Sequence, residues 1–260
     1  MKGSRRSFLA AAAAAPLLAK SGALLAAGGN DGSTQLSKMK KMTNKDFYKA
    51  DGSFDADAAK KAYYALMESF GYPIPDALKT DQFWVCDFLT REFASVGMGG
   101  VFWLNECGTY GQSGAKAYKG KFSGQKFGYL GHDIYLLPGQ VLPEHHHIGG
   151  EKGYGPKMEG WHVRHGSVTF YGEYKGDGGE APISEMPAGE RPWGYGKDWF
   201  KCKYFAKRKA GQTYTLNDPE SWHFQVADNQ GAIVSEYATF HNHVSFSRPG
   251  MEFDCSKAKK

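Results

Sequence analysis

Histidine is concentrated in one part of the chain. All nine histidines lie between His132 and His243, and three of them are consecutive, at His145, His146 and His147. If this segment is a strand, side chains two residues apart point to the same face, so His145 and His147 converge while His146 faces away. Two imidazoles and a carboxylate are common ligands of a divalent transition metal. The segment therefore predicts a metal site, with His146 in a structural role.

Two glutamates compete to supply the carboxylate. A spacing of three or four residues after the histidine pair selects Glu151. Glu159 stands instead at the start of the next predicted strand, from which it can reach back to a metal held at the end of the preceding strand. Four glycines between positions 149 and 155 surround Glu151, as in a mobile loop. This favours Glu159 but leaves Glu151 open.

A fourth ligand is expected from a strand that folds beside the first. His223 follows the strand-like run 213–216 and the polar turn 217–219, and it enters another strand-like segment. Glu236 lies in the apolar run 232–237. It either faces solvent on a half-buried strand or points into a cavity, where its pKa would be raised and it could act as a general base.

Short strands must position these side chains. The clearest strand-like runs are 101–104, 133–137, 161–163, 168–171, 213–216 and 232–240. Residues 108–128 and 175–196 are predicted to be long loops. With 15% aromatic residues and 34 glycines, the chain favours a turn-rich, antiparallel all-β fold with a lined cavity over a helical bundle.

One helix is predicted ahead of the strands, over residues 55–70. Asp55 or Asp57 can cap its beginning, and Gly71 ends it. Apolar residues recur at helical spacing and form a single stripe, which predicts packing against the sheet. These residues are Tyr63, Leu66, Met67 and Phe70.

The first residues predict export from the cytoplasm. The run 4–9 (SRRSFL) matches the twin-arginine pattern, and an alanine-rich apolar stretch follows it. This stretch is too short and too alanine-rich to hold well in a bilayer, which favours cleavage over a membrane anchor. Small residues at 26–28 suit cleavage. We therefore expect a periplasmic protein with no membrane attachment after cleavage.

Three predicted parts follow the signal peptide, which covers residues 1–27. They are a flexible linker at 28–45, a helical extension at 46–80 and a barrel domain at 81–260. The net charge of +5 is mild and spread along the chain, so nucleic acid is not an expected partner.

Cysteine spacing says little about function. The four cysteines show no C-x-x-C spacing, which argues against a zinc knuckle or a thioredoxin-like motif. The periplasm permits disulfides, but the spacing selects no pairing, and buried thiols are equally compatible. The cysteines are Cys86, Cys107, Cys202 and Cys255.

Several of these segments together resemble the D-lyxose ketol-isomerase family of cupins. The resemblance covers about residues 83–250, and it rests on the segments 97–105, 136–147, 157–166, 211–216, His223 and 231–236. It implies a single jelly-roll-like β-barrel that holds Mn²⁺, with Fe²⁺, Zn²⁺ or Co²⁺ as alternatives. It also implies interconversion of an aldose and a ketose, D-lyxose and D-xylulose or a mannose-type sugar, through a cis-enediol.

The resemblance assigns roles to individual residues. It selects Glu159 over Glu151, and the implied metal ligands are His145, His147, Glu159 and His223. Lys157 and Glu236 would be catalytic, with Lys157 steadying an oxyanion and Glu236 moving a proton. Three residues would contact the sugar, although the two tryptophans are equally compatible with core packing. They are Arg164, Trp161 and Trp222.

The chain also departs from the family. Where the family tends to carry acidic residues after Glu236, this chain reads His241-Asn242-His243, and the helical region and the 108–128 loop are enlarged. Export is unusual for a sugar isomerase, because these reactions serve cytoplasmic pathways. The alternatives are another metallocupin enzyme (an epimerase or an iron dioxygenase) and a non-catalytic sugar-binding cupin. A homodimer is compatible with either reading.

Overall fold

The computed structural model describes most of the chain beyond the predicted signal peptide and linker. The described residues are 42–109, 126–148, 157–176, 180–240 and 244–253. The predicted signal peptide, most of the linker and Glu151 therefore lie outside them. Within these ranges, no helix is both long enough and apolar enough to cross a membrane.

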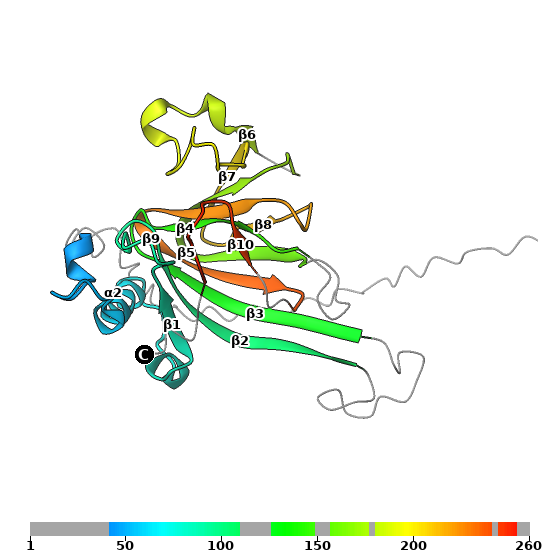
Figure 1. Cartoon of the computed structure of the whole chain (residues 1–260). Helices are drawn as coiled ribbons and strands as arrows, with labels where there is room; N and C mark the ends of the chain where they lie inside the picture. Colours follow the sequence, from blue (N-terminus) through cyan, green and yellow to red (C-terminus); the bar gives the residue numbers. More distant parts are fainter. Residues whose placement is uncertain (1–41, 110–125, 149–156, 177–179, 241–243, 254–260) are drawn as a thin grey trace, which may run out of the picture. The chain divides into compact units, whose positions relative to one another are not determined.

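Helix α2 (Ala56–Ser69) confirms the predicted helix. Asp55 caps it, because its side chain accepts a hydrogen bond from the backbone N–H of Ala58 at 3.0 Å. The chain leaves the helix through Gly71, whose φ of +64° suits a residue without Cβ. Three residues of the predicted apolar stripe are buried and Phe70 is half-buried, and α2 packs against the first two strands of the sheet; Figure 1 shows α2 beside β1 (Phe83–Cys86).

The described strands form one antiparallel sheet, which confirms the all-β, cupin-like prediction. Its main path runs β1-β2-β3-β9-β5-β7-β6, while β4 extends from β9, β10 from β4, and β8 from β5. Among the described strands this path does not close into a continuous hydrogen-bonded barrel. The further bounds are β2 Met98–Thr109, β3 Lys126–Leu136, β4 Val141–His146, β5 Glu159–Gly172, β6 Ala181–Pro182, β7 Tyr204–Lys209, β8 Thr213–Thr215, β9 His223–Ala238 and β10 Ser245–Phe246.

Three sequence predictions differ from the structure. The runs 161–163 and 168–171 belong to one strand, β5, because a bulge near Gly166 absorbs the break in the pattern. The predicted loop 108–128 is shorter, since β2 and β3 extend into both of its ends. The predicted loop 175–196 contains β6 and two short 3-10 helices, Ile183–Glu185 and Ala188–Glu190.

Strand β9 pairs with three other strands of the sheet, β3, β4 and β5. Its first half pairs with β4 and its second half with β3, while β5 runs along both halves. A turn at Pro138-Gly139 joins β3 to β4, and Gly139 adopts a φ of +73°. Residues directly opposite each other in antiparallel strands share a face. The pairs His145–His223 and His132–Glu236 therefore each project to one face.

Two apolar clusters pack around this sheet. One contains the α2 stripe and the residues on one face of β1, and the other contains the residues on the other face of β1 with residues of β3, β5 and β9. The thiols of Cys86 and Cys202 are buried. The side chain of Cys107 and all of Cys255 lie outside what the structure describes.

Candidate active site

Three histidines from two distant parts of the chain meet in the interior. His145 is on β4, His147 directly follows β4, and His223 begins β9. Their ligand-capable nitrogen atoms all lie within 4.8 Å of one another, and all three residues are buried. The strand register explains the meeting, because His145 lies directly opposite His223. Three imidazoles at this separation could hold one divalent ion.

Backbone carbonyls orient two of these imidazoles. The Nδ1 atom of His145 lies 2.8 Å from the carbonyl oxygen of Pro143, and that of His223 lies 3.0 Å from the carbonyl oxygen of Ser221. A carbonyl can only accept, so both Nδ1 atoms carry the proton and both Nε2 lone pairs are available to a metal. Burial lowers the pKa of His145 to about 4 and that of His223 well below its usual range, so both rings are neutral at pH 7.

Glu159 joins the histidines from the first residue of β5. Its Oε2 atom lies 3.2 Å from Nε2 of His223, and its Oε1 atom lies 3.6 Å from Nε2 of His147. Burial raises the pKa of Glu159 to about 8, although the neighbouring Lys157 opposes the shift. Three imidazole nitrogens and one buried carboxylate fit a divalent cation, whose charge would stabilise the ionised carboxylate.

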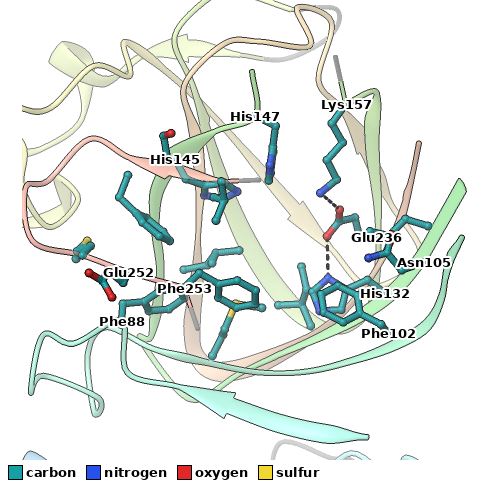
Figure 2. Close-up of a pocket in the computed structure, with 18 residues that line it drawn as sticks. Phe88, Phe102, Asn105, His132, His145, His147, Lys157, Glu236, Glu252 and Phe253 are labelled. Carbon is teal, nitrogen blue, oxygen red and sulfur yellow. Dashed lines mark hydrogen bonds and ion pairs between the residues drawn. The ribbon is translucent and has the colours of Figure 1, made fainter. Parts of the chain in front are cut away.

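A second polar group lies beside this cluster. The Nζ atom of Lys157 is 2.7 Å from Oε1 of Glu159 and 2.5 Å from Oε1 of Glu236. The other oxygen of Glu236 is 2.9 Å from Nδ1 of His132. Figure 2 shows Lys157, Glu236 and His132 in one line at the edge of the cavity. Glu236 is therefore on the cavity side, which decides between its two sequence interpretations.

The expected rise in the pKa of Glu236 is wrong. Burial alone would raise it, but the ammonium of Lys157 and the hydrogen bond from His132 outweigh burial and hold the pKa well below its usual range. The carboxylate is consequently ionised at neutral pH. The sequence could not show this, because the two partners come from elsewhere in the fold.

Sequence reasoning did not single out His132. It lies on β3 directly opposite Glu236, with its ring stacked on Phe102 and Trp84 at centroid distances of 4.5 and 5.4 Å. Gly100 makes room for this stack, because an added Cβ would lie 2.4 Å from the Trp84 ring. The usable signal was its position one residue before the predicted strand 133–137, but only the register identifies its partner.

The three predicted sugar-contacting residues do not line the cavity. Trp161 is buried and packs 5.5 Å from the His223 ring, behind the histidine cluster. Trp222 stacks on His146 at 3.8 Å, which agrees with the structural role expected for His146. Arg164 is exposed on β5. Their contacts with a sugar stay predictions.

The cavity itself has a volume of about 850 Å³. His145, His147, Lys157, Glu236 and His132 all line it, so two of the four candidate ligands and the second polar group face the same space. A ligand in this space can contact both sets of side chains. The arrangement suits a reaction that combines a Lewis acid with a carboxylate base.

This chain has a cupin-like sheet with a buried cluster of three histidines and one glutamate, and known proteins with sequence or fold similarity to it can be compared on that basis. One curated relative, the D-lyxose/D-mannose isomerase of Thermosediminibacter oceani, is 33% identical over 113 residues, which cover 43% of this chain. The match spans 56% of that relative's length. No family model matches the chain.

Solved structures of L-ribose isomerases have a similar fold. The ligand-free enzyme of Cellulomonas parahominis matches with a TM-score of 0.53 and 14% identity, over 78% of this chain and 94% of that one. The enzyme of Acinetobacter sp. DL28 with L-ribose matches with a TM-score of 0.51 and 17% identity, over 75% and 92% of the two chains. These similarities support the cupin-like fold.

Proposed function

We propose that this protein is a metal-dependent aldose–ketose isomerase of the cupin type. The observation that carries the proposal is the contact of Lys157 with both Glu159 and Glu236, which joins the metal-ligand cluster to a candidate base at one cavity. The partial similarity to a D-lyxose/D-mannose isomerase supports D-lyxose and D-xylulose, or a mannose-type sugar, as the substrate class.

The metal would be held by His145, His147, Glu159 and His223. Their imidazole nitrogens and single carboxylate suit a divalent transition metal, for which we propose Mn²⁺, with Fe²⁺, Zn²⁺ and Co²⁺ as alternatives. When bound, the ion supplies a Lewis acid that polarises the sugar carbonyl and acidifies the adjacent C–H bond.

Glu236 would move the proton, and Lys157 would stabilise the negative charge. The ionised carboxylate of Glu236 takes the proton from C2 of the aldose, while the ammonium of Lys157 steadies the charge that develops on O1 as the cis-enediol forms. Glu236 then returns the proton to C1 and the proton of the O2 hydroxyl passes to O1, which gives the ketose and restores both side chains. His132 holds the second carboxylate oxygen and so fixes the direction in which Glu236 points.

The proposal also covers the location of the protein and its division into domains. A twin-arginine signal peptide at 1–27 would deliver the folded, metal-loaded protein to the periplasm, and the linker 28–45 and helical extension 46–80 would precede the barrel domain 81–260. The proposal keeps three predicted sugar contacts, Arg164, Trp161 and Trp222. The alternatives are a metallocupin epimerase or dioxygenase, and a sugar-binding protein without turnover.

The substitution Glu236→Gln tests the proposal. We expect aldose–ketose exchange to fall by about 10²–10⁴-fold, because the amide cannot accept the C2 proton. Metal content, measured by elemental analysis, should stay at the wild-type level. NMR in D₂O with a panel of aldoses should find solvent deuterium at C1 or C2 of the wild-type product.

The exposed Glu68 on α2 gives a matched control, and Glu68→Gln should leave exchange unchanged. Oxygen consumption with a small aromatic or thiol substrate would instead indicate a dioxygenase. Thermal stabilisation by a sugar without any exchange would indicate a binding protein.

A further inference from the structure

The cavity has two chemically different ends. The candidate base and its two partners are at one end, where Figure 2 shows Lys157, Glu236 and His132 close together. Phe88 and Phe253 lie away from this group, near Glu252. The wall on that side is apolar, and it is built from Phe88, Met98, Leu142, Phe246, Met251 and Phe253.

This apolar wall is a packed structure. Phe88 contacts Phe246 edge to face at 5.3 Å and stacks on Phe253 at 6.1 Å, measured between ring centroids. Phe88 is fully buried, and Phe253 also packs against Trp84 of β1 at 5.1 Å. Phe246 lies opposite His145 on the paired strands β10 and β4, so the wall begins directly beside the histidine cluster.

The wall does not suit the tail of a free sugar. Each carbon of an aldose beyond C2 carries oxygen, and a hydroxyl group that loses water without gaining a partner weakens binding. Among the described residues, the polar side chains on this side of the cavity are Ser245 and Glu252. A stacked sugar face can contact an aromatic ring, but its hydroxyl groups still need partners at the edges.

The size of the cavity also indicates a ligand larger than a free sugar. Its volume of about 850 Å³ lies in the upper part of the range that accommodates drug-sized ligands. A free pentose or hexose is several times smaller and would leave the apolar end hydrated. Filling that end with an apolar group would release this water and gain binding energy.

We propose that the substrate is an aldose or ketose that carries an apolar, preferably aromatic, substituent on its terminal carbon. The sugar's C1–C2 end lies at Lys157 and Glu236, and the substituent lies against Phe88, Phe246 and Phe253. This inference rests on the proposed isomerase function, and it adds the chemical class of the substrate. It also gives an exported enzyme a substrate outside ordinary cytoplasmic sugar metabolism.

The test compares two substrates on the metal-loaded mature protein. D-mannose and 6-O-benzyl-D-mannose share the same C1–C2 chemistry and differ in the terminal substituent. We expect kcat/KM to be about 10–100-fold higher for the benzyl ether, mainly through a lower KM, which is the range that burial of one aromatic ring provides. Equal or higher kcat/KM for D-mannose would overturn the inference while leaving the isomerase proposal intact.

A variant locates the effect in the apolar wall. Phe253→Ala should lower the benzyl-to-free ratio of kcat/KM by about tenfold. Both sugars are measured on one sample, so any loss of folded enzyme cancels from the ratio. Tyr174→Ala is the control, because Tyr174 is 53% exposed and lies outside the cavity lining, and it should leave the ratio unchanged. An unchanged ratio in Phe253→Ala would contradict the assignment.

Calorimetry separates this inference from the proposed function. If neither sugar is isomerised but the benzyl ether binds at least tenfold more tightly than D-mannose, the isomerase proposal fails and the apolar subsite stands. If the benzyl ether shows neither turnover nor preferential binding, the subsite assignment fails.

Discussion

At the residue scale, the site depends on how Glu236 is held. Both of its carboxylate oxygens have partners, Lys157 on one side and His132 on the other. A buried carboxylate between two donors stays ionised and points in one direction, as a base must before it meets its substrate. Lys157 also contacts Glu159, so the base and the metal-ligand cluster share one cation. A change at either partner should therefore appear in turnover more than in substrate binding.

The role of His132 can be tested with two variants that separate its functions. His132→Phe keeps the stack on Trp84 and Phe102 but removes the hydrogen bond to Glu236, and we expect kcat to fall about 10–100-fold with KM little changed. His132→Asn keeps a donor near the Nδ1 position and should retain most of kcat. Steady-state kinetics and a thermal melt of each variant check this. A loss of kcat in His132→Asn without a loss in His132→Phe would indicate a role in packing alone.

His145 predicts a pH dependence of stability in metal-free protein. Its pKa is lowered from 6.5 to about 4 by burial, so unfolding takes up a proton between these values and the folded state loses stability as pH falls through this window. The loss is about 1.4 kcal/mol per pH unit relative to a variant without the imidazole.

Urea unfolding of chelator-treated wild type and His145→Asn between pH 7 and pH 4 measures this difference. The variant isolates His145 from Glu159, whose raised pKa acts with the opposite sign in an overlapping window. A difference in unfolding free energy that does not change with pH would show that the imidazole is not buried and neutral.

At the element scale, the register between β5 and β9 positions the site. β5 pairs with the second half of β9 through Glu159–Ala238 and Trp161–Glu236, and with the first half through Gly172–His223. A bulge near Gly166 in β5, and the residues around Gly231 of β9, whose φ is +79°, take up the offset between these two stretches. Because of this offset, one continuous strand lies beside both His223 and Glu236.

Gly166 is the residue on which this offset depends. Its φ is +73°, and an added Cβ would lie 2.0 Å from the carbonyl oxygen of Gly231. We expect Gly166→Ala to lower the unfolding free energy by at least about 2 kcal/mol, through backbone strain and the clash. Gly160→Ala, in the same strand, is the control, because its Cβ would meet Thr215 at an ordinary 3.6 Å. Equilibrium denaturation should separate the two variants, and equal losses would contradict this account.

At the scale of the whole molecule, the candidate metal site ties together strands that are far apart in the sequence. Its proposed ligands come from β4, from the residue after it, from β5 and from β9. An ion held by all of them would bind the folded state and not the unfolded chain, so loading should stabilise the protein as a unit.

Metal removal tests this linkage. At an ion concentration about 100 times Kd, loading stabilises by about 2.7 kcal/mol, which corresponds to roughly 5–10 °C in Tm for a chain of this size. We expect Mn²⁺ to raise the Tm of chelator-treated wild type by this amount and to have little effect on His223→Ala. His146→Ala is the matched control and should keep the shift, because His146 stacks on Trp222 outside the cluster. A full shift in His223→Ala would exclude the proposed site.

The sequence by itself determined the local features of this protein. The stripe in α2 with its Asp55 cap, the strand-rich texture and the alternation of His145 and His147 follow from short-range geometry that neighbouring residues contain. Only the tertiary structure decided which distant side chains meet. His132 opposite Glu236, and the two carboxylates that share Lys157, depend on strand register, and the low pKa of Glu236 follows from those neighbours. Register is set by packing across the whole sheet, so no local pattern contains it.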